Sequence, residues 1–315
     1  MHAIEKILAK NSGRAEVHTG EIVTAKVDFA EINDLYLQTV YSFYEMGGEK
    51  VWNRERAAFV FDHYAPCPDI KSAANHKEMR EFAKKNDLRF HFDTNCGVCH
   101  QVMPEAGVIY PGMIVVATDS HTTTGGAIGM LAIGGGGMDG ATAMAGLPIR
   151  LKMPKVVRVY LTGKLRPGCS GKDVILEMLR RYSVKGGLGR VYEYVGPGVE
   201  TMEVPERATI ANMGAELGAT TSIFPADETV RRFFIAQDRE KDFVEMKADE
   251  GCEYDEYVEI NLSELEPLMS CPHSPDNVKK VKDVEKKPVQ QVFIGSCTNG
   301  SYTDIARAAL VFKGH

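Results

Sequence analysis

The chain has 315 residues, of which 44% are hydrophobic and 25% charged, and its formal net charge at pH 7 is −6. A chain of this length and composition is expected to form two or three globular domains. The mildly acidic balance, without a tract rich in lysine or arginine, argues against nucleic acid or an anionic membrane as a partner.

The chain begins with an expected amphipathic helix, because Ile4, Ile7 and Leu8 are spaced as on one helical face. This N-terminal sequence lacks the apolar core and cleavage site of a secretory signal. The longest stretch poor in charge, residues 125–149, is too rich in glycine for a membrane span. Seven scattered cysteines fit a reducing compartment better than a disulfide framework. We therefore expect a cytoplasmic protein.

Strands alternate with helices further along the chain, which predicts an α/β architecture with parallel or mixed sheets flanked by helices. Apolar runs predict strands over residues 57–61, 113–118, 156–161 and 289–294. Helical spacing predicts helices over residues 75–86, from Asp173 onward, and over residues 303–310.

Two shifts in composition divide the chain into expected domains. One lies near Pro154, and the other is a charged stretch with proline over residues 279–288. The predicted domains are residues 1–155, 156–286 and 287–315, the last being the beginning of a third domain.

Polar side chains follow three of the predicted strands directly. Asp62 and His63 come after the first, residues 119–122 (DSHT) after the second, and residues 295–299 (GSCTN) after the last. A single such group would be read as a helix cap or a solvated loop histidine. Three at equivalent places favour a ligand site, since open α/β sheets bind ligands at the carboxyl ends of their strands. An aspartate beside a histidine also suits a proton donor.

The segment CGVCH at residues 96–100 has three readings: a c-type haem attachment, a redox dithiol, or a functional His100 beside two incidental cysteines. Without export, haem attachment is disfavoured, and the residues alone leave the other two readings open. The run of glycines at 134–137 lacks the Gly-Lys-Ser/Thr of a phosphate loop, so we expect close backbone packing there.

Six stretches form an ordered set that spans nearly the whole chain. They are FDH (61–63), GVCHQ (97–101), PGMIVVATDSHTTTGGAIG (111–129), NMGAELGATTSIFPADE (212–228), EINLSELEP (259–267) and FIGSCTNGSYTD (293–304). This set resembles the aconitase superfamily, and most of all its branch of large subunits of 3-isopropylmalate dehydratase. The resemblance implies an aconitase-like multi-domain α/β fold. It also implies a hydro-lyase that isomerises a hydroxy di- or tricarboxylic acid by dehydration and rehydration.

The same resemblance implies roles for individual residues. Asp62 and His63 would be the acid pair for the leaving hydroxyl. The other implied catalytic residues, around the water or hydroxyl, are His100, Asp119, His121 and its carboxylate partner Glu216. The implied substrate-binding residues are Gln38, Ser120 and Asn212, although Tyr36 replaces the threonine that usually precedes the glutamine. His100 is then the functional residue of CGVCH, and a structural role is favoured for Cys99.

The family holds a [4Fe–4S] cluster with three cysteine thiolates, and an open iron acts as a Lewis acid. Cys297 would be the first ligand, while the downstream C-x-x-C that supplies the other two is absent from this chain. We therefore expect a chain truncated within its third domain that does not hold the cluster alone. The catalytic serine would lie on a separate small subunit, so activity would need both that partner and a complete third domain.

Thr124 favours the isopropylmalate branch, and hence leucine biosynthesis, over aconitase, which has asparagine there. Homoaconitase and 2,3-dimethylmalate dehydratase stay open as alternatives, as does aconitase itself. An alternative of another class is a non-catalytic fragment that only binds the small subunit.

Overall fold

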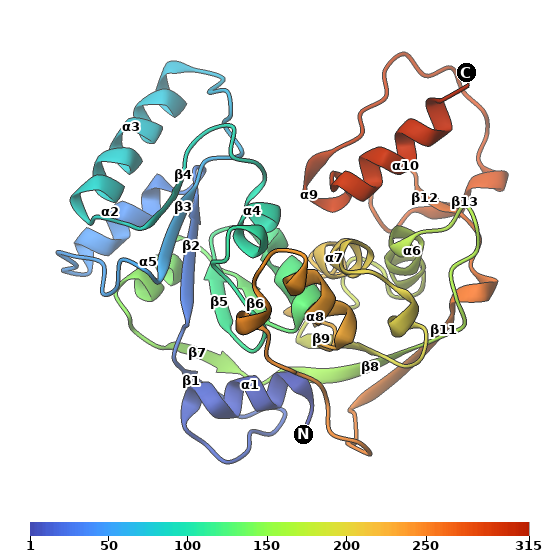
Figure 1. Cartoon of the computed structure of the whole chain (residues 1–315), viewed down its shortest axis with the longest axis horizontal. Coiled ribbons are helices and arrows are strands. Elements are labelled where there is room, and N and C mark those ends of the chain that lie inside the picture. Colours follow the sequence, from blue (N-terminus) through green and yellow to red (C-terminus); the bar gives the residue numbers. More distant parts are fainter. Residues whose placement is uncertain (315) are drawn as a thin grey trace.

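A computed structural model describes residues 1–314, and its first half is built on a five-stranded parallel sheet (Figure 1). Its strands are β2 (Phe29–Asn33), β3 (Ala57–Val60), β4 (Phe90–Phe92), β5 (Ile114–Ala117) and β6 (Leu131–Gly134). The spatial order is β4-β3-β2-β5-β6. The chain thus runs outward from β2 to β4 and returns on the other side of β2, so the strand order reverses between β2 and β5.

Helices cover both faces of this first sheet, to its left and right in Figure 1. On one side lie α2 (Leu37–Glu45), α3 (Ile70–Lys85) and α5 (Gly137–Met144), packed around an apolar cluster that includes Phe43, Phe59 and Phe82. On the other lie α4 (Cys99–Glu105), the 3₁₀ helix η1 (Ser120–Ile128) and α8 (Glu228–Ile235). A second cluster, which includes Met103, Ile128 and Phe234, fills that side.

A second parallel sheet has the order β10-β9-β8-β11. Its strands are β8 (Lys155–Thr162), β9 (Arg190–Val195), β10 (Thr221–Ile223) and β11 (Glu256–Asn261), accompanied by α6 (Gly171–Tyr182) and α7 (Val204–Asn212). Two antiparallel pairs complete the strands: β1 (Ile22–Ala25) with β7 (Ile149–Lys152), and β12 (Leu268–Ser270) with β13 (Val278–Lys280). The remaining helices are α1 (Ala3–Ser12), η2 (Val199–Thr201), η3 (Glu240–Asp242), η4 (Leu262–Glu264), η5 (Val281–Asp283), α9 (Ser296–Asn299) and α10 (Tyr302–Phe312).

Helix η1 joins the two halves of the molecule. The backbone N–H of Phe224 donates to the carbonyl of Gly126 over 2.9 Å, and the Thr123 hydroxyl donates to the carbonyl of Ala211 over 2.8 Å. A Cβ atom on Gly126 would lie 1.6 Å from the carbonyl oxygen of Ser222, so only glycine allows this approach. The segment that carries DSHT is therefore held firmly between the sheets.

Most predicted elements are confirmed. The strands expected at 57–61, 113–118 and 156–161 are β3, β5 and β8, and the expected helices are α1, α3, α6 and α10. Helix α3 begins earlier than predicted, at Ile70, because Asp69 caps it by accepting the backbone N–H of Ser72 over 2.7 Å. Within the glycine run, close backbone packing is confirmed for Gly134, where a Cβ atom would lie 2.6 Å from the carbonyl oxygen of Asp119, whereas Gly135 faces the Asp139 side chain. The domain limits stay a prediction.

The strand predicted over residues 289–294 is wrong. This apolar segment has no strand assignment and is exposed, with Val292 68% and Phe293 81% accessible. A strand needs a neighbour to take up its backbone hydrogen bonds, and the described residues offer none here. Helix α10, which follows, has no buried residue. No helix among the described residues is long and apolar enough to cross a membrane.

Glu193 in β9 should make folding stability depend on pH. Burial raises the pKa of Glu193 to about 7, although the backbone N–H of Ala3 donates to its carboxyl over 3.2 Å. An unfolded chain has a glutamate pKa of about 4.3, so ionising this group opposes folding as pH rises through about 4 to 7. Glu193→Gln removes that penalty. Thermal unfolding at about pH 5 and about pH 8 would measure this: the melting temperature of the variant, relative to that of wild type, should be higher at about pH 8 than at about pH 5. An equal difference at both pH values would contradict this.

Candidate active site

The predicted acid pair lies where the strand order of the first sheet reverses. Asp34 follows β2, Asp62 and His63 follow β3, and Asp119 follows β5. Parallel sheets bind ligands at such a point, because the loops on its two sides leave in opposite directions and open a crevice. Three carboxylates and an imidazole therefore meet at the ligand-binding edge of the sheet.

His63 is held by carboxylates from three loops. Its Nδ1 lies 2.8 Å from Asp62 Oδ1 and 3.6 Å from Asp34 Oδ1, and its Nε2 lies 3.2 Å from Asp119 Oδ2. Contacts with Asp119, Asp34 and Asp62 raise the pKa of His63 to about 12. Both ring nitrogens therefore carry a proton at neutral pH. A third of the side chain (33%) is exposed, so a ligand can reach it.

His100 shares Asp119 with His63. Its Nε2 lies 2.8 Å from Asp119 Oδ1, and its side chain is only 5% exposed. Asn33 and the backbone N–H of His121 also donate to Asp119, over 3.2 and 2.7 Å. Burial would raise the pKa of Asp119, but the hydrogen bonds from His100 and His63 hold it well below its usual range. Asp119 is thus an ionised carboxylate that fixes two imidazoles.

Asp34 belongs to this network, although the sequence patterns did not identify it. Its fully buried carboxylate accepts the backbone N–H groups of His63 and Tyr64 over 3.0 and 2.7 Å. It also lies 2.9 Å from Nε2 of His76, a buried residue of α3. These bonds fix the loop that carries the Asp62–His63 pair. A signal existed, because Asp34 follows a strand directly, but the polar residues within FAEIN hid that strand.

His121 and Glu216 lie within hydrogen-bonding distance, as the family motifs predict. His121 Nε2 is 3.2 Å from Glu216 Oε1, although the two residues are 95 positions apart. Ser120 is exposed, and its hydroxyl lies 3.0 Å from His121 Nδ1. A carboxylate on one ring nitrogen fixes the orientation of the imidazole, so His121 presents a defined face beside the main network.

The other two residues predicted to bind substrate are placed very differently. Asn212 is buried, and its amide is engaged on both sides: it donates to the Thr124 hydroxyl over 2.9 Å and accepts from the Thr298 hydroxyl over 2.9 Å. It therefore ties η1 to α9. Gln38 is exposed on α2 and forms no hydrogen bond with the histidine and aspartate residues described above.

The two cysteines of CGVCH have unequal surroundings. Cys96 is exposed, whereas Cys99 is buried at the start of α4, and both are free thiols. Burial, with the nearby carboxyl of Glu31, raises the pKa of the Cys99 thiol well above its usual range. Cys99 therefore stays a neutral thiol at neutral pH, which fits the structural role expected for it.

A cavity of about 350 Å³ lies beside this network, between α4, η1, α7 and α9. Its lining includes His100 and Thr124 together with Cys297 and Thr298. Thr298 is fixed by the Thr209 hydroxyl, which donates to its carbonyl over 2.9 Å. The predicted cluster ligand Cys297 therefore faces the same space as His100.

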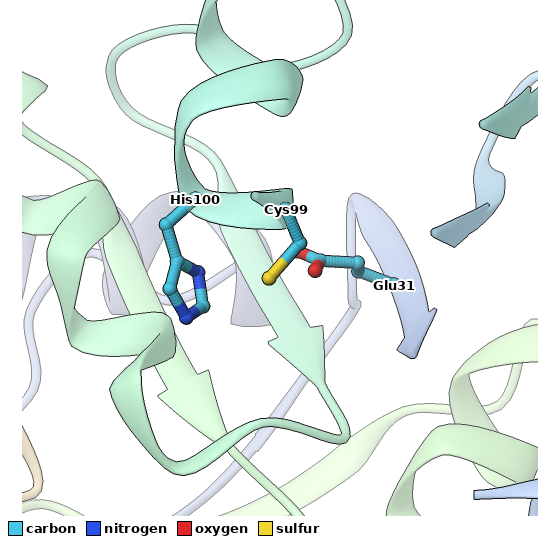
Figure 2. Close-up of side chains that lie close together, drawn as sticks. All are labelled: Glu31, Cys99 and His100. Atoms are coloured by element: carbon cyan, nitrogen blue, oxygen red, sulfur yellow. The ribbon is translucent and has the colours of Figure 1, made fainter. Parts of the chain in front are cut away.

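Two groups of side chains have donor atoms within 4.8 Å of one another, close enough to hold a metal ion. They are Glu31–Cys99–His100, shown in Figure 2, and Asp34–Asp62–His63. In each group the imidazole is already bound to a carboxylate, His100 to Asp119 and His63 to Asp62.

The sequence is similar to known proteins over most of its length. Residues 5–288 match the model of the aconitase family (aconitate hydratase). A probable 3-isopropylmalate dehydratase large subunit of Methanothermobacter thermautotrophicus is 40% identical over 99% of this chain and 75% of its own length. The 3-isopropylmalate dehydratase large subunit of Aquifex aeolicus is 39% identical over 99% of this chain and 72% of its own length.

Among solved structures, aconitase X from Thermococcus kodakaraensis aligns with a TM-score of 0.42 and 14% identity, over 76% of this chain and 57% of that one. So remote a likeness adds nothing to the sequence matches. The family match covers most of the chain, and the two large subunits match nearly all of it. The chain therefore belongs to the aconitase family.

Proposed function

We propose that this chain supplies the proton-donating side of a hydro-lyase of the 3-isopropylmalate dehydratase type, as its large subunit. The observation that carries the proposal is His63, a partly exposed imidazole held between Asp62 and Asp119 at the ligand-binding edge of the first sheet. The 40% identity to the Methanothermobacter large subunit supports the same reaction class.

In the dehydration step, the carbon–oxygen bond of the substrate breaks and the hydroxyl leaves with the bonding electrons. The Nε2 proton of His63 moves to this oxygen, and water forms. Hydroxide is a strong enough base to take a proton even from an imidazolium held by carboxylates. The proton on the neighbouring carbon goes to a base outside this chain, and the electrons of that bond form the double bond. In the rehydration step, the hydroxyl of a water molecule adds to the carbon that lost its proton, and the remaining proton of that water returns to His63. The base outside this chain returns its proton to the carbon that lost the hydroxyl, so the hydroxyl has moved to the neighbouring carbon.

The other side chains would orient the reactants. Asp62 keeps Nδ1 of His63 hydrogen-bonded, so that Nε2 is the transferring atom. His100 and His121 would hold the released water beside Asp119. Among the predicted substrate-binding residues, the exposed Ser120 and Gln38 are able to donate to a substrate carboxylate. The amide of Asn212 is already engaged, so we propose that it supports the wall of the site.

The family resemblance implies a [4Fe–4S] cluster, which supplies Lewis-acid polarisation of the substrate hydroxyl when bound. Among the described residues lining the cavity, the cysteines are Cys297 and Cys96. A cubane with one open iron takes three thiolates, so these residues do not complete its ligand set. The contribution of this chain to the reaction then lies in its acid–base residues.

We further propose a small subunit as partner, which would supply the base, and a place in the cytoplasm in leucine biosynthesis. The preferred substrate is isopropylmalate. Homocitrate, dimethylmalate and citrate are the competing substrates, and they correspond to the alternative members of the family.

A chimera tests the function. Residues 1–315 are joined to the part of the Methanothermobacter large subunit that this chain does not cover, reconstituted anaerobically with iron and sulfide, and mixed with the matching small subunit. We expect isopropylmalate to be dehydrated to an unsaturated diacid, seen as a rise in ultraviolet absorbance, faster than the three competing acids. Complex formation without turnover of any of the four would reject the enzyme and favour a non-catalytic binding chain.

A further inference from the structure

Glu31 is a buried carboxyl in the middle of β2, a strand whose residues are all buried. Its side chain is 3% exposed, and its partners on the neighbouring strands are Ala58 and Ala117. These two small residues leave space beside the longer glutamate. Glutamate is rarely buried so fully, because removing a carboxyl from water costs free energy unless a partner compensates. The proposed reaction steps do not use this residue.

The carboxyl of Glu31 lies beside the first turn of α4. One of its oxygens is within 4.8 Å of both Cys99 Sγ and a ring nitrogen of His100. In Figure 2 the Cys99 sulfur and the Glu31 carboxyl lie on the same side of the His100 ring. Oxygen Oε1 is buried without a hydrogen-bond partner among the described residues. The carboxyl thus approaches the imidazole while keeping one acceptor unused.

Glu31 also lines the cavity that extends to Cys297. Much of the wall around it is apolar, with Val115, Ile128 and Met130 among its residues. A carboxyl in such surroundings interacts strongly with the few charges nearby, since little water screens it. Glu31 and His100 line the same cavity, and the imidazole is the group near this carboxyl that can carry a positive charge.

We propose that Glu31 is a positioning residue for His100, giving its imidazole a second carboxyl besides Asp119 and so holding both the ring and its proton in place. The consequence for catalysis rests on the proposed function. The contact itself can be tested without turnover.

The charged and titratable groups around Glu31 are His100, Cys99, Asp62 and Asp119. Burial raises the pKa of Glu31 to about 7, with His100 opposing the shift. Burial opposes a positive charge on His100, but its hydrogen bond to Asp119 and the charge of Glu31 raise its pKa. The Cys99 thiol stays neutral, because its pKa is raised well above the usual range. Glu31 therefore gains its negative charge beside the His100 ring as pH rises through about 7.

The test is a titration of the histidine rings by NMR, in the 315-residue chain labelled on histidine. His100→Gln identifies the His100 signals. Glu31→Gln keeps the size of the side chain but removes the charge, and we expect it to lower the pKa of His100 by about 0.5 to 1 unit. Glu31→Met, which also removes hydrogen bonding, should lower it at least as much. In wild type, the His100 signals should show an additional inflection near pH 7, from Glu31 itself.

Glu193→Gln is the matched control, because Glu193 is a buried glutamate of the second sheet whose pKa is also raised to about 7. It should leave the His100 titration unchanged. An unaltered His100 pKa in Glu31→Gln, or an equal shift in Glu193→Gln, would overturn the proposal, as would a wild-type curve without the inflection. Failure of the chimera to dehydrate any acid would reject the proposed function and leave this titration result standing.

Discussion

His63→Ala is expected to lower kcat of the complete chimera complex by about 10²- to 10⁴-fold, the usual contribution of general acid catalysis. KM should change far less, because the proton is donated to the departing hydroxyl only in the transition state. The structure supports this because the ring is both protonated and reachable, with three carboxylates on it and a third of its side chain exposed.

Steady-state kinetics with isopropylmalate would measure the effect. Asp62→Asn should cause a smaller loss, because the ring stays and only the bond to Nδ1 is weakened. His18→Ala, at an exposed histidine (63%) beside Glu16, is a control that should not change kcat. Iron content should equal that of wild type in all three variants. Near-normal kcat in His63→Ala with full iron content would show that the acid is another residue, with His100 or His121 as candidates.

Arg207→Met is expected to lower the free energy of unfolding by about 3 to 5 kcal/mol, the range found when one partner of a buried ion pair is removed. Arg207 in α7 is fully buried and forms two hydrogen bonds with the Asp227 carboxylate, over 2.9 and 2.8 Å. It also donates to the carbonyls of Met202, Pro225 and Val199. Methionine would fill most of the space but leave these acceptors unpaired.

Urea unfolding, followed by circular dichroism, would give the difference in the free energy of unfolding. Arg232→Met is the matched control, because Arg232 is 57% exposed and lies 3.4 Å from Glu203 at the surface. Exposed pairs of this kind contribute about 0 to 1 kcal/mol. A loss below about 1 kcal/mol in Arg207→Met would mean that the Arg207–Asp227 pair does not hold α7 and α8 together.

Strands made of unbroken apolar residues could be predicted from the sequence. AAFVF and MIVVAT are β3 and β5 because buried parallel strands are apolar on both faces. Strand β2 escaped prediction because FAEIN carries a glutamate and an asparagine, both buried. The opposite error occurred at VQQVFI, whose composition suits a strand but which has no neighbour to pair with. Local pattern shows what a segment could form, and only the tertiary structure supplies its partner.

Family motifs predicted more of the site than the types and spacing of individual residues did. Pairing His121 with Glu216 needed the family resemblance, because no spacing rule links residues 95 positions apart. Asp34 and Glu31 were missed for a different reason. Their importance comes from burial beside imidazoles, and burial depends on how the strands stack. The one local sign, the position of Asp34 directly after a strand, was lost because that strand was itself not predicted.

The exposed helix α10 and the apolar segment before it imply that the molecule is unevenly stable. Helix α10 buries no residue, and its ties to α7 include the ion pair of Arg307 with Glu206 over 3.1 Å. Segments with little buried apolar area open at small free-energy cost, independently of global unfolding. Cys297 lies in this part of the chain, whereas His63 and Asp119 directly follow the fully buried strands β3 and β5. Helix α10 should therefore open at a smaller free-energy cost than the strands of the first sheet, while the bonds of Thr298 to Asn212 and Thr209 keep α9 beside the cavity.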